Sequence, residues 1–136
     1  MTTLEIPSNR LYTATHTWLT HPVDPLAEAP LRIGVTPDAF DGLDIVAVNL
    51  PPVRSYVEAG APCAVLWTSA WAAITVLAPI SGVVTFTNAA PVIDPEIMVK
   101  DPFDAGWLFA VLPSPAHTTD ELLTAAQYQL ARDDAA

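Results

Sequence analysis

The alternation of apolar and polar residues predicts a chain built mainly of short strands. The segment "RLYTATHTWLT" (10–20) alternates as a strand pair or as one strand with a turn, and "LRIGVT" (31–36) predicts a further strand after a proline-rich loop. "DIVAVNLP" (44–51) predicts a strand with alternating faces. One face would carry Ile45, Ala47 and Asn49, and the other Val46, Val48 and Leu50.

The longest apolar stretch is "CAVLWTSAWAAITVLAP" (63–79), which contains no charge and no glycine. Pro62 and Pro79 bracket sixteen residues, fewer than the roughly 20 that a membrane-spanning helix needs. Val, Ile, Thr and Trp are strand formers. The stretch therefore predicts two buried strands joined by a tight turn, with Trp71 near the turn.

Helical signals are few. Thr36 stands in a capping position before a helical turn that is expected to begin at Pro37. Near the C-terminus, Thr118 and Glu121 have the spacing of a capping box, and the expected helix carries apolar residues at Leu122, Ala126 and Leu130. The last residues would form a frayed tail. Together the elements predict a mainly β fold, a flattened β-sandwich with short helical additions and a C-terminal helix.

Composition narrows the possible functions. A chain of 136 residues with 51% hydrophobic residues is the size of one domain and can bury a substantial core. Fifteen acidic against five basic residues give a formal charge of -10, which argues against binding to nucleic acid or to anionic membranes. The first ten residues lack the apolar core of a secretory signal, so we expect a cytoplasmic protein.

Residues that could carry chemistry are scattered. Cys63 is the only cysteine and is expected to be a small buried hydrophobic residue, the alternative being a reactive thiol. His16 is expected to be a structural or surface residue, and the three histidines lack the spacing of a metal site. Ser69 lies outside any nucleophile motif. No catalytic constellation emerges, so we expect neither an enzyme nor a metal centre.

Two features suggest contact with a partner. Loop acids form either a solvated face or a docking surface for a basic partner; they are Asp94, Glu96, Asp101 and Asp104. Trp71 is either an exposed interface anchor or a side chain folded down onto its own domain. The remaining tryptophans lie in strand-like segments and are expected to be buried or half-buried; they are Trp18, Trp67 and Trp107.

A set of motifs in a fixed order extends from Tyr12 to Tyr128. They are "YTATHTWL", "IGVTPDAFDGLDIVAVNLP", "VEAGAP", "APISGVV", "NAAPVIDPEIMVKDPFDAGWLF" and "DELLTAAQY". Their order and spacing resemble the H protein of the glycine cleavage system. The resemblance implies a lipoyl-domain fold, a barrel-sandwich hybrid. It divides the chain into an N-terminal extension (1–11), an H-protein-like domain (12–130) and a C-terminal tail (131–136).

The same resemblance implies a degenerate site of lipoate attachment. The family carries lipoate on the lysine of a hairpin that reads Glu-Ser-Val-Lys-Ala-Ala-Ser, and the corresponding segment here is "TSAWAAI". Thr68 replaces the glutamate, Trp71 the lysine and Ile74 the serine. The only lysine is Lys100, in a distant loop. Because an indole offers no primary amine for an amide bond, we expect no lipoate cofactor.

These observations lead to a prediction of function. We expect a non-lipoylated domain that acts by binding a protein partner, as scaffold, regulator or inhibitor of a glycine-cleavage-like or lipoate-related enzyme. The expected contact residues are Thr68, Ser69, Ala70, Trp71, Asp101 and Asp104. The alternative is a specialised group-transfer component that holds its cargo without lipoyl-lysine, with Cys63 or a noncovalent ligand in that role.

Overall fold

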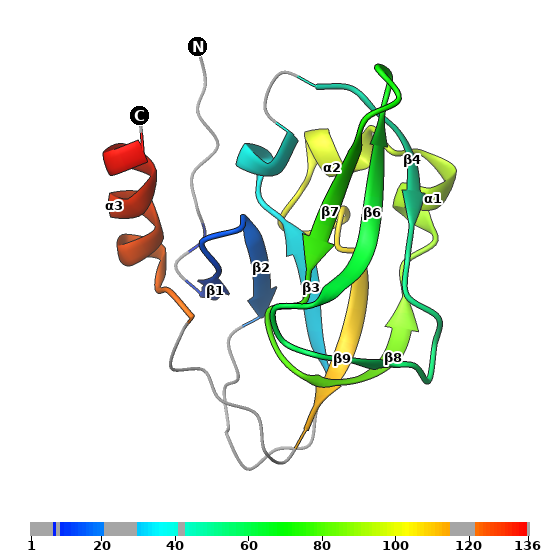
Figure 1. The fold of residues 1–136 in the computed structure, drawn as a ribbon, viewed down its shortest axis with the longest axis horizontal. Helices are drawn as coiled ribbons and strands as arrows, with labels where there is room; N and C mark the ends of the chain where they lie inside the picture. Colours follow the sequence, from blue (N-terminus) through cyan, green and yellow to red (C-terminus); the bar gives the residue numbers. More distant parts are fainter. Residues whose placement is uncertain (1–6, 8, 21–29, 41–42, 115–121, 136) are drawn as a thin grey trace.

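The computed structural model describes residues 7, 9–20, 30–40, 43–114 and 122–135, which form two antiparallel sheets with short helices at their margins (Figure 1). The larger sheet contains, in spatial order, β1 (Arg10–Tyr12), β2 (Thr17–Thr20), β3 (Leu31–Val35), β9 (Phe109–Pro113), β8 (Gly82–Thr87) and β5 (Tyr56–Val57). The smaller sheet contains β4 (Ile45–Asn49), β6 (Pro62–Thr68) and β7 (Ala73–Leu77). The helices are η1 (Pro37–Phe40), α1 (Ala90–Ile93), α2 (Ile97–Lys100) and α3 (Ala125–Ala135).

This architecture confirms the mainly β fold with short helices and a C-terminal helix. The uncharged stretch forms the antiparallel β6–β7 hairpin, as predicted, and its tip projects at the top of Figure 1. The prediction that both strands are buried is wrong, because only every second residue of β6 and only Val76 of β7 are buried. None of the helices within the described parts of the chain is both long and apolar enough to span a bilayer.

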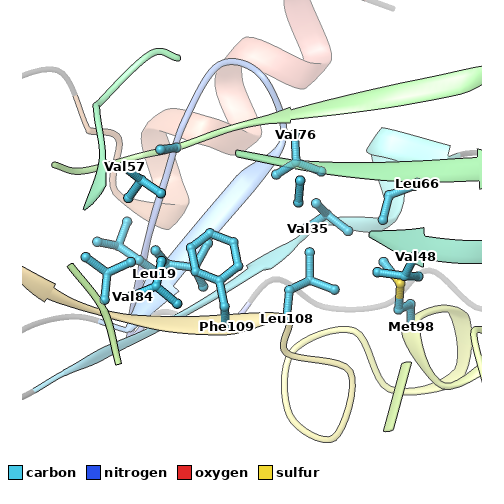
Figure 2. Packing of buried hydrophobic residues seen from close by; sticks show 14 of the residues in the cluster. Leu19, Val35, Val48, Val57, Leu66, Val76, Val84, Met98, Leu108 and Phe109 are labelled. Carbon is cyan, nitrogen blue, oxygen red and sulfur yellow. The ribbon is translucent and has the colours of Figure 1, made fainter. Parts of the chain in front are cut away.

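The hydrophobic core lies between the two sheets (Figure 2). Leu66 and Val76 of the hairpin face Leu108 and Phe109 at the start of β9, and all four are buried. Because β6 alternates between the core and the outside, Ala64, Leu66 and Thr68 face inward. The core therefore fixes which residues the hairpin presents outward.

A second cluster covers the outer face of the larger sheet and attaches α3. The rings of Tyr12 and Tyr128 are stacked with centroids 4.9 Å apart, and Trp18 is buried beside them. Gly34 permits this packing, since a Cβ atom there would lie 2.5 Å from the Trp18 ring. The indole N–H of Trp18 donates to the carbonyl of Pro102 at 3.0 Å, as expected for a buried tryptophan.

The faces of β4 differ from the predicted alternation. Ile45 and Val48 are both buried, whereas Val46 and Ala47 are exposed. The register with β6 shifts between Ile45 and Ala47, so Val46 is an extra residue in the ladder. Such a β-bulge resets the alternation, and the apolar pattern of the segment contains no sign of it.

The C-terminal helix begins later than predicted. Leu123 is in extended backbone pairing with Tyr12, with N···O distances of 2.7 and 2.8 Å, so the helix begins only after it. The capping box at its start is Thr124 with Gln127, each of whose backbone N–H groups donates to the other's side chain. The capping pair predicted from the sequence, Thr118 with Glu121, lies outside the described residues.

The apolar face predicted for this helix is also wrong. Ala126 and Leu130 are exposed, and Tyr128 is the side chain that packs against the sheet. The helix continues to Ala135, through residues that were expected to belong to a frayed tail. Packing of one aromatic residue, rather than an aliphatic stripe, therefore attaches α3.

The predicted helical turn at Pro37 is present as η1 with Thr36 directly before it, but the Thr36 hydroxyl bonds to residues outside the turn. The Thr36 hydroxyl lies 2.6 Å from the Tyr128 hydroxyl, and the carbonyl of Thr36 accepts a bond from the N–H of Ala39. The side chain of Thr36 is thus part of the attachment of α3.

Candidate functional site

The tip of the β6–β7 hairpin is a three-residue loop closed by backbone hydrogen bonds. The N–H of Trp71 donates to the carbonyl of Thr68 at 3.0 Å, and the N–H of Thr68 donates to the carbonyl of Ala72 at 2.9 Å. The loop residues Ser69 and Ala70 are exposed. Trp71 has a φ of 64°, the left-handed conformation that hairpin loops of this length usually give to glycine.

The side chain of Trp71 is 85% exposed, which settles the choice left open by the sequence in favour of a projecting tip. A bulky residue with positive φ carries a backbone strain of about 1–2 kcal/mol. The fold therefore exposes a large aromatic side chain at a position with a strained backbone. With 85% of its surface exposed, the Trp71 side chain gains little packing energy to offset that strain.

Thr68 does not present its side chain to a partner. It is 1% exposed, and its Oγ1 atom accepts a hydrogen bond from the N–H of Ala72 at 3.2 Å. The residue that was predicted to contact a partner instead holds the loop from within. Next to it, the N–H of Ser69 donates to the carbonyl of Asp44 at 3.0 Å and ties the tip to the segment before β4.

The outer face of the hairpin is uncharged. Ala47, Trp67 and Ala73 lie in one row across the three strands, and Asn49 and Val65 begin the next. The indole N–H of Trp67 donates to Oδ1 of Asn49 at 2.6 Å, and Trp67 is half-buried, as predicted. The exposed tip therefore continues into an uncharged sheet surface.

The predicted acidic contacts lie in the turn between α2 and β9, and they differ from each other. Asp101 is half-buried and its carboxylate accepts a bond from the N–H of Ala105 at 3.1 Å, so it shapes the turn. Asp104 is exposed. Within the described residues, no hydrogen bond or ion pair joins this turn to the hairpin tip. The tip and the acidic turn are separate elements of the surface.

Cys63 and His16 have structural environments. The Cys63 thiol is half-buried and donates to the carbonyl of Val76 at 3.3 Å, and burial raises its pKa from 9.0 to about 12. The His16 Nδ1 atom lies 2.7 Å from the Tyr128 hydroxyl, which agrees with a structural role. His21 and His117 lie outside the described residues. The described part of the chain contains no group of three or more His, Cys, Asp and Glu side chains able to hold a metal.

Comparison with known proteins shows the family to which this fold belongs. A family model described as "Glycine cleavage H-protein" matches residues 10–134. The chain belongs to the glycine cleavage H-protein family. It is 37% identical over 127 residues to a glycine cleavage system H protein of Thermus thermophilus, and the match covers 93% of this chain and 94% of that protein. For the H protein of Shewanella oneidensis the identity is 38% over 130 residues, covering 95% and 97%.

The fold agrees with that of a solved H protein. A crystal structure of a glycine cleavage system H protein from Mycobacterium marinum is similar with a TM-score of 0.85 and 37% identity, and it covers 94% of this chain and 99% of that one. Family membership confirms the resemblance found in the sequence. H-protein family members are carriers rather than enzymes, so the chain belongs to a class of non-catalytic proteins.

Proposed function

We propose that this H-protein family member is not lipoylated and acts by binding a protein partner through its hairpin tip. The observation that carries the proposal is the placement of Trp71, 85% exposed on a loop held by hydrogen bonds. Partner binding of this kind would scaffold, regulate or inhibit an enzyme. The partner we favour is a glycine-cleavage-like or lipoate-related enzyme, and the first of these is supported by the interaction of H proteins with glycine cleavage enzymes.

The residues present do not fit the family's cofactor, lipoate. Attachment requires a primary amine, and the side chain that the hairpin tip projects is the indole of Trp71, whose N–H is not nucleophilic. Lys100, the only lysine of the sequence, lies on α2 and forms an exposed ion pair with Glu96 at 3.4 Å. Nothing at the tip can therefore form the amide.

An exposed tryptophan on a restrained loop has the properties of an interface anchor. Trp has few rotatable bonds to immobilise and can bury on the order of 200 Å² in a partner's pocket. Three hydrogen bonds among Thr68, Trp71 and Ala72 hold the loop before any partner arrives, which lowers the ordering cost of association. The exposed Asp104 would add electrostatic steering toward a basic rim.

The alternative, a group-transfer component that holds its cargo on Cys63, has less support. The raised pKa keeps the thiol protonated at neutral pH, and the thiolate is the reactive form. The thiol is also hydrogen-bonded within the hairpin rather than directed from its tip.

Two measurements test the proposal. Co-expression with a lipoate ligase and lipoate should leave the intact mass at that of the unmodified polypeptide, and a lipoyl adduct on Lys100 would contradict it. Affinity purification of the tagged full-length chain from its native cell, followed by mass spectrometry, should recover a partner enzyme. The variant Trp71→Ala should lose that partner, while Phe86→Ala, which removes another exposed aromatic residue from β8, should retain it. Equal recovery with both variants would contradict a role for the tip.

A further inference from the structure

The C-terminal helix α3 is attached to the rest of the domain mainly through one side chain. Among the α3 side chains that the structure describes, only that of Tyr128 is buried, and Ala126, Gln127 and Leu130 are exposed. The helix lies at the margin of the molecule, beside the edge strand β1 (Figure 1). A helix of 11 residues is marginal in water without tertiary packing. The helical form of α3 therefore depends on the contacts of Tyr128.

Tyr128 makes contacts through both its ring and its hydroxyl. The ring is stacked on Tyr12, with the centroids 4.9 Å apart. The hydroxyl oxygen lies 2.7 Å from Nδ1 of His16 and 2.6 Å from Oγ1 of Thr36, within hydrogen-bonding distance of both. Just before the helix, Leu123 adds two backbone hydrogen bonds to Tyr12. Together these contacts join residues 123–135, which we call the C-terminal strap, to the larger sheet.

The partners of the Tyr128 hydroxyl are held in place by bonds that do not involve the strap. The N–H of His16 donates to the carbonyl of Thr13 at 3.2 Å and closes the turn between β1 and β2. The N–H of Thr36 donates to the carbonyl of His16 at 2.9 Å. His16 and Thr36 are therefore positioned for Tyr128 whether or not the strap is bound.

The aromatic surface that the strap covers is also held by residues outside the strap. The indole N–H of Trp18 donates to the carbonyl of Pro102 at 3.0 Å, and the Arg10 guanidinium lies 5.1 Å from the centre of the Trp18 ring. Nη2 of Arg10 in turn donates to the carbonyl of Phe103 at 3.0 Å. Tyr12 and Trp18 are 0% and 1% exposed when the strap is bound. Release of the strap would thus uncover an ordered aromatic surface.

We propose that the C-terminal strap opens and closes as one unit while both sheets stay folded. The strands of the two sheets all end by Pro113, before the strap begins, and segments with few buried apolar contacts open at a lower free energy than the whole domain. The open form presents Tyr12 and Trp18 to solvent, with Arg10 beside them. The hydroxyl contacts of Tyr128 set the ratio of the two forms. This inference does not depend on the proposed function.

Native-state hydrogen exchange of the unaltered full-length chain, in urea below the unfolding transition, tests the strap. The amides of Leu123, Tyr128 and Tyr12 should share one opening free energy, lower than that of the amides of β6 and β9. Their exchange should depend weakly on urea, because opening the strap exposes little surface. The amide of Tyr12 is informative, since it belongs to a sheet strand but donates to Leu123. One free energy and one urea dependence for strap and sheets would overturn the proposal.

The variant Tyr128→Phe tests the hydroxyl contacts, because it keeps the ring that stacks on Tyr12. It should speed the exchange of the strap amides at least about tenfold, since it removes the bonds to His16 and Thr36 from the closed form alone. The matched control is Leu130→Ala, which shortens an exposed side chain of the same helix and should leave exchange in the strap unchanged. Equal effects of the two variants would overturn the role of the hydroxyl.

A third variant separates opening of the strap from unfolding of the whole domain. Val76→Ala removes buried volume from the core between the sheets, so it weakens the closed and the open form alike. It should speed the exchange of the β6 and β9 amides and leave the amides of Leu123, Tyr128 and Tyr12 unchanged. Faster exchange of the strap amides by the same factor as the sheet amides would show that the strap opens only when the domain unfolds, and would overturn the proposal.

Discussion

The backbone N–H of Trp71 lies 3.0 Å from the carbonyl oxygen of Thr68, and this bond closes a loop whose last residue has a positive φ. The two residues have opposite environments, since Thr68 is buried and Trp71 projects into water. Thr68 holds the loop in place, and the loop exposes Trp71 to solvent. This division leads to separate predictions for binding and for stability.

Replacing Trp71 with alanine should weaken binding to the native partner at least about tenfold, which corresponds to about 1.4 kcal/mol. The reason is that truncating a central tryptophan anchor removes most of its buried contact area. Isothermal titration with the purified partner measures the change, with circular dichroism as a check of the fold. An unchanged affinity would leave the tryptophan without an anchoring role.

Charge reversal at Asp104 should change the association rate rather than the dissociation rate, because the residue is exposed at the surface of a turn. Asp104→Lys should slow association with a basic partner, and the effect should diminish at high salt. Stopped-flow association rates at two salt concentrations test this. A change in dissociation rate alone, independent of salt, would rule out a rim role for this carboxylate.

The strained φ of Trp71 gives a prediction for stability. Trp71→Gly should be more stable than Trp71→Ala by about 0.5–1 kcal/mol, since glycine adopts the left-handed conformation without steric cost. Both variants remove an exposed side chain, so Trp71→Ala alone should change the free energy of unfolding by less than about 1 kcal/mol. Urea unfolding of the two variants decides the order, and a more stable alanine variant would contradict the strain.

Thr68→Val should destabilise the protein by about 1–2 kcal/mol, although it keeps the size of the side chain. The variant removes the buried Oγ1 atom, so the N–H of Ala72 loses the hydrogen bond that it donates to Thr68. Thr75→Val on the same hairpin is the control, because Thr75 is exposed and should tolerate the change within about 0.5 kcal/mol. Equal effects at the two positions, measured by thermal unfolding, would contradict the role of the Thr68 hydroxyl.

The Cys63 thiol should be unreactive in the folded protein. With its pKa raised from 9.0 to about 12, the thiolate fraction at pH 8 falls about a thousandfold relative to an exposed cysteine. A folded pKa above the unfolded one means that the folded state retains its proton longer, so this group's contribution to stability declines as pH rises from about 9 to about 12. Iodoacetamide labelling, with urea-unfolded protein as reference, measures the reactivity. Rapid labelling of the folded chain at pH 8 would contradict the burial.

The hairpin could be predicted from the sequence because its limits are local. Two prolines bracket a stretch without charge, and β-branched residues fill it. The bulge at Val46 could not be predicted, since one extra residue leaves the apolar pattern of β4 almost unchanged. The burial of Thr68 likewise depends on which face of β6 meets the core, and a hydroxyl residue at a strand end gives no sign of that.

The start of α3 could not be predicted from the sequence for a different reason. Thr118 with Glu121 and Thr124 with Gln127 both have the spacing of a capping box, and the first pair precedes the more apolar run. The pairing of Leu123 with Tyr12, which are far apart in the chain, prevents a helix from running through Leu123. A contact between the two ends of the domain therefore sets where α3 begins, and sequence periodicity contains no information about such contacts.

The pairing of Tyr12 with Leu123 also imposes an order on the folding steps of the newly made chain. During synthesis, β1 emerges from the ribosome before Leu123 and Tyr128. The aromatic side chains of β1 and β2 therefore stay exposed until α3 packs on them. The two sheets and the hairpin need no residue of α3 for their ladders. The sheets that hold Trp71 can therefore assemble before the two ends of the domain close, and the hairpin tip does not depend on that last step.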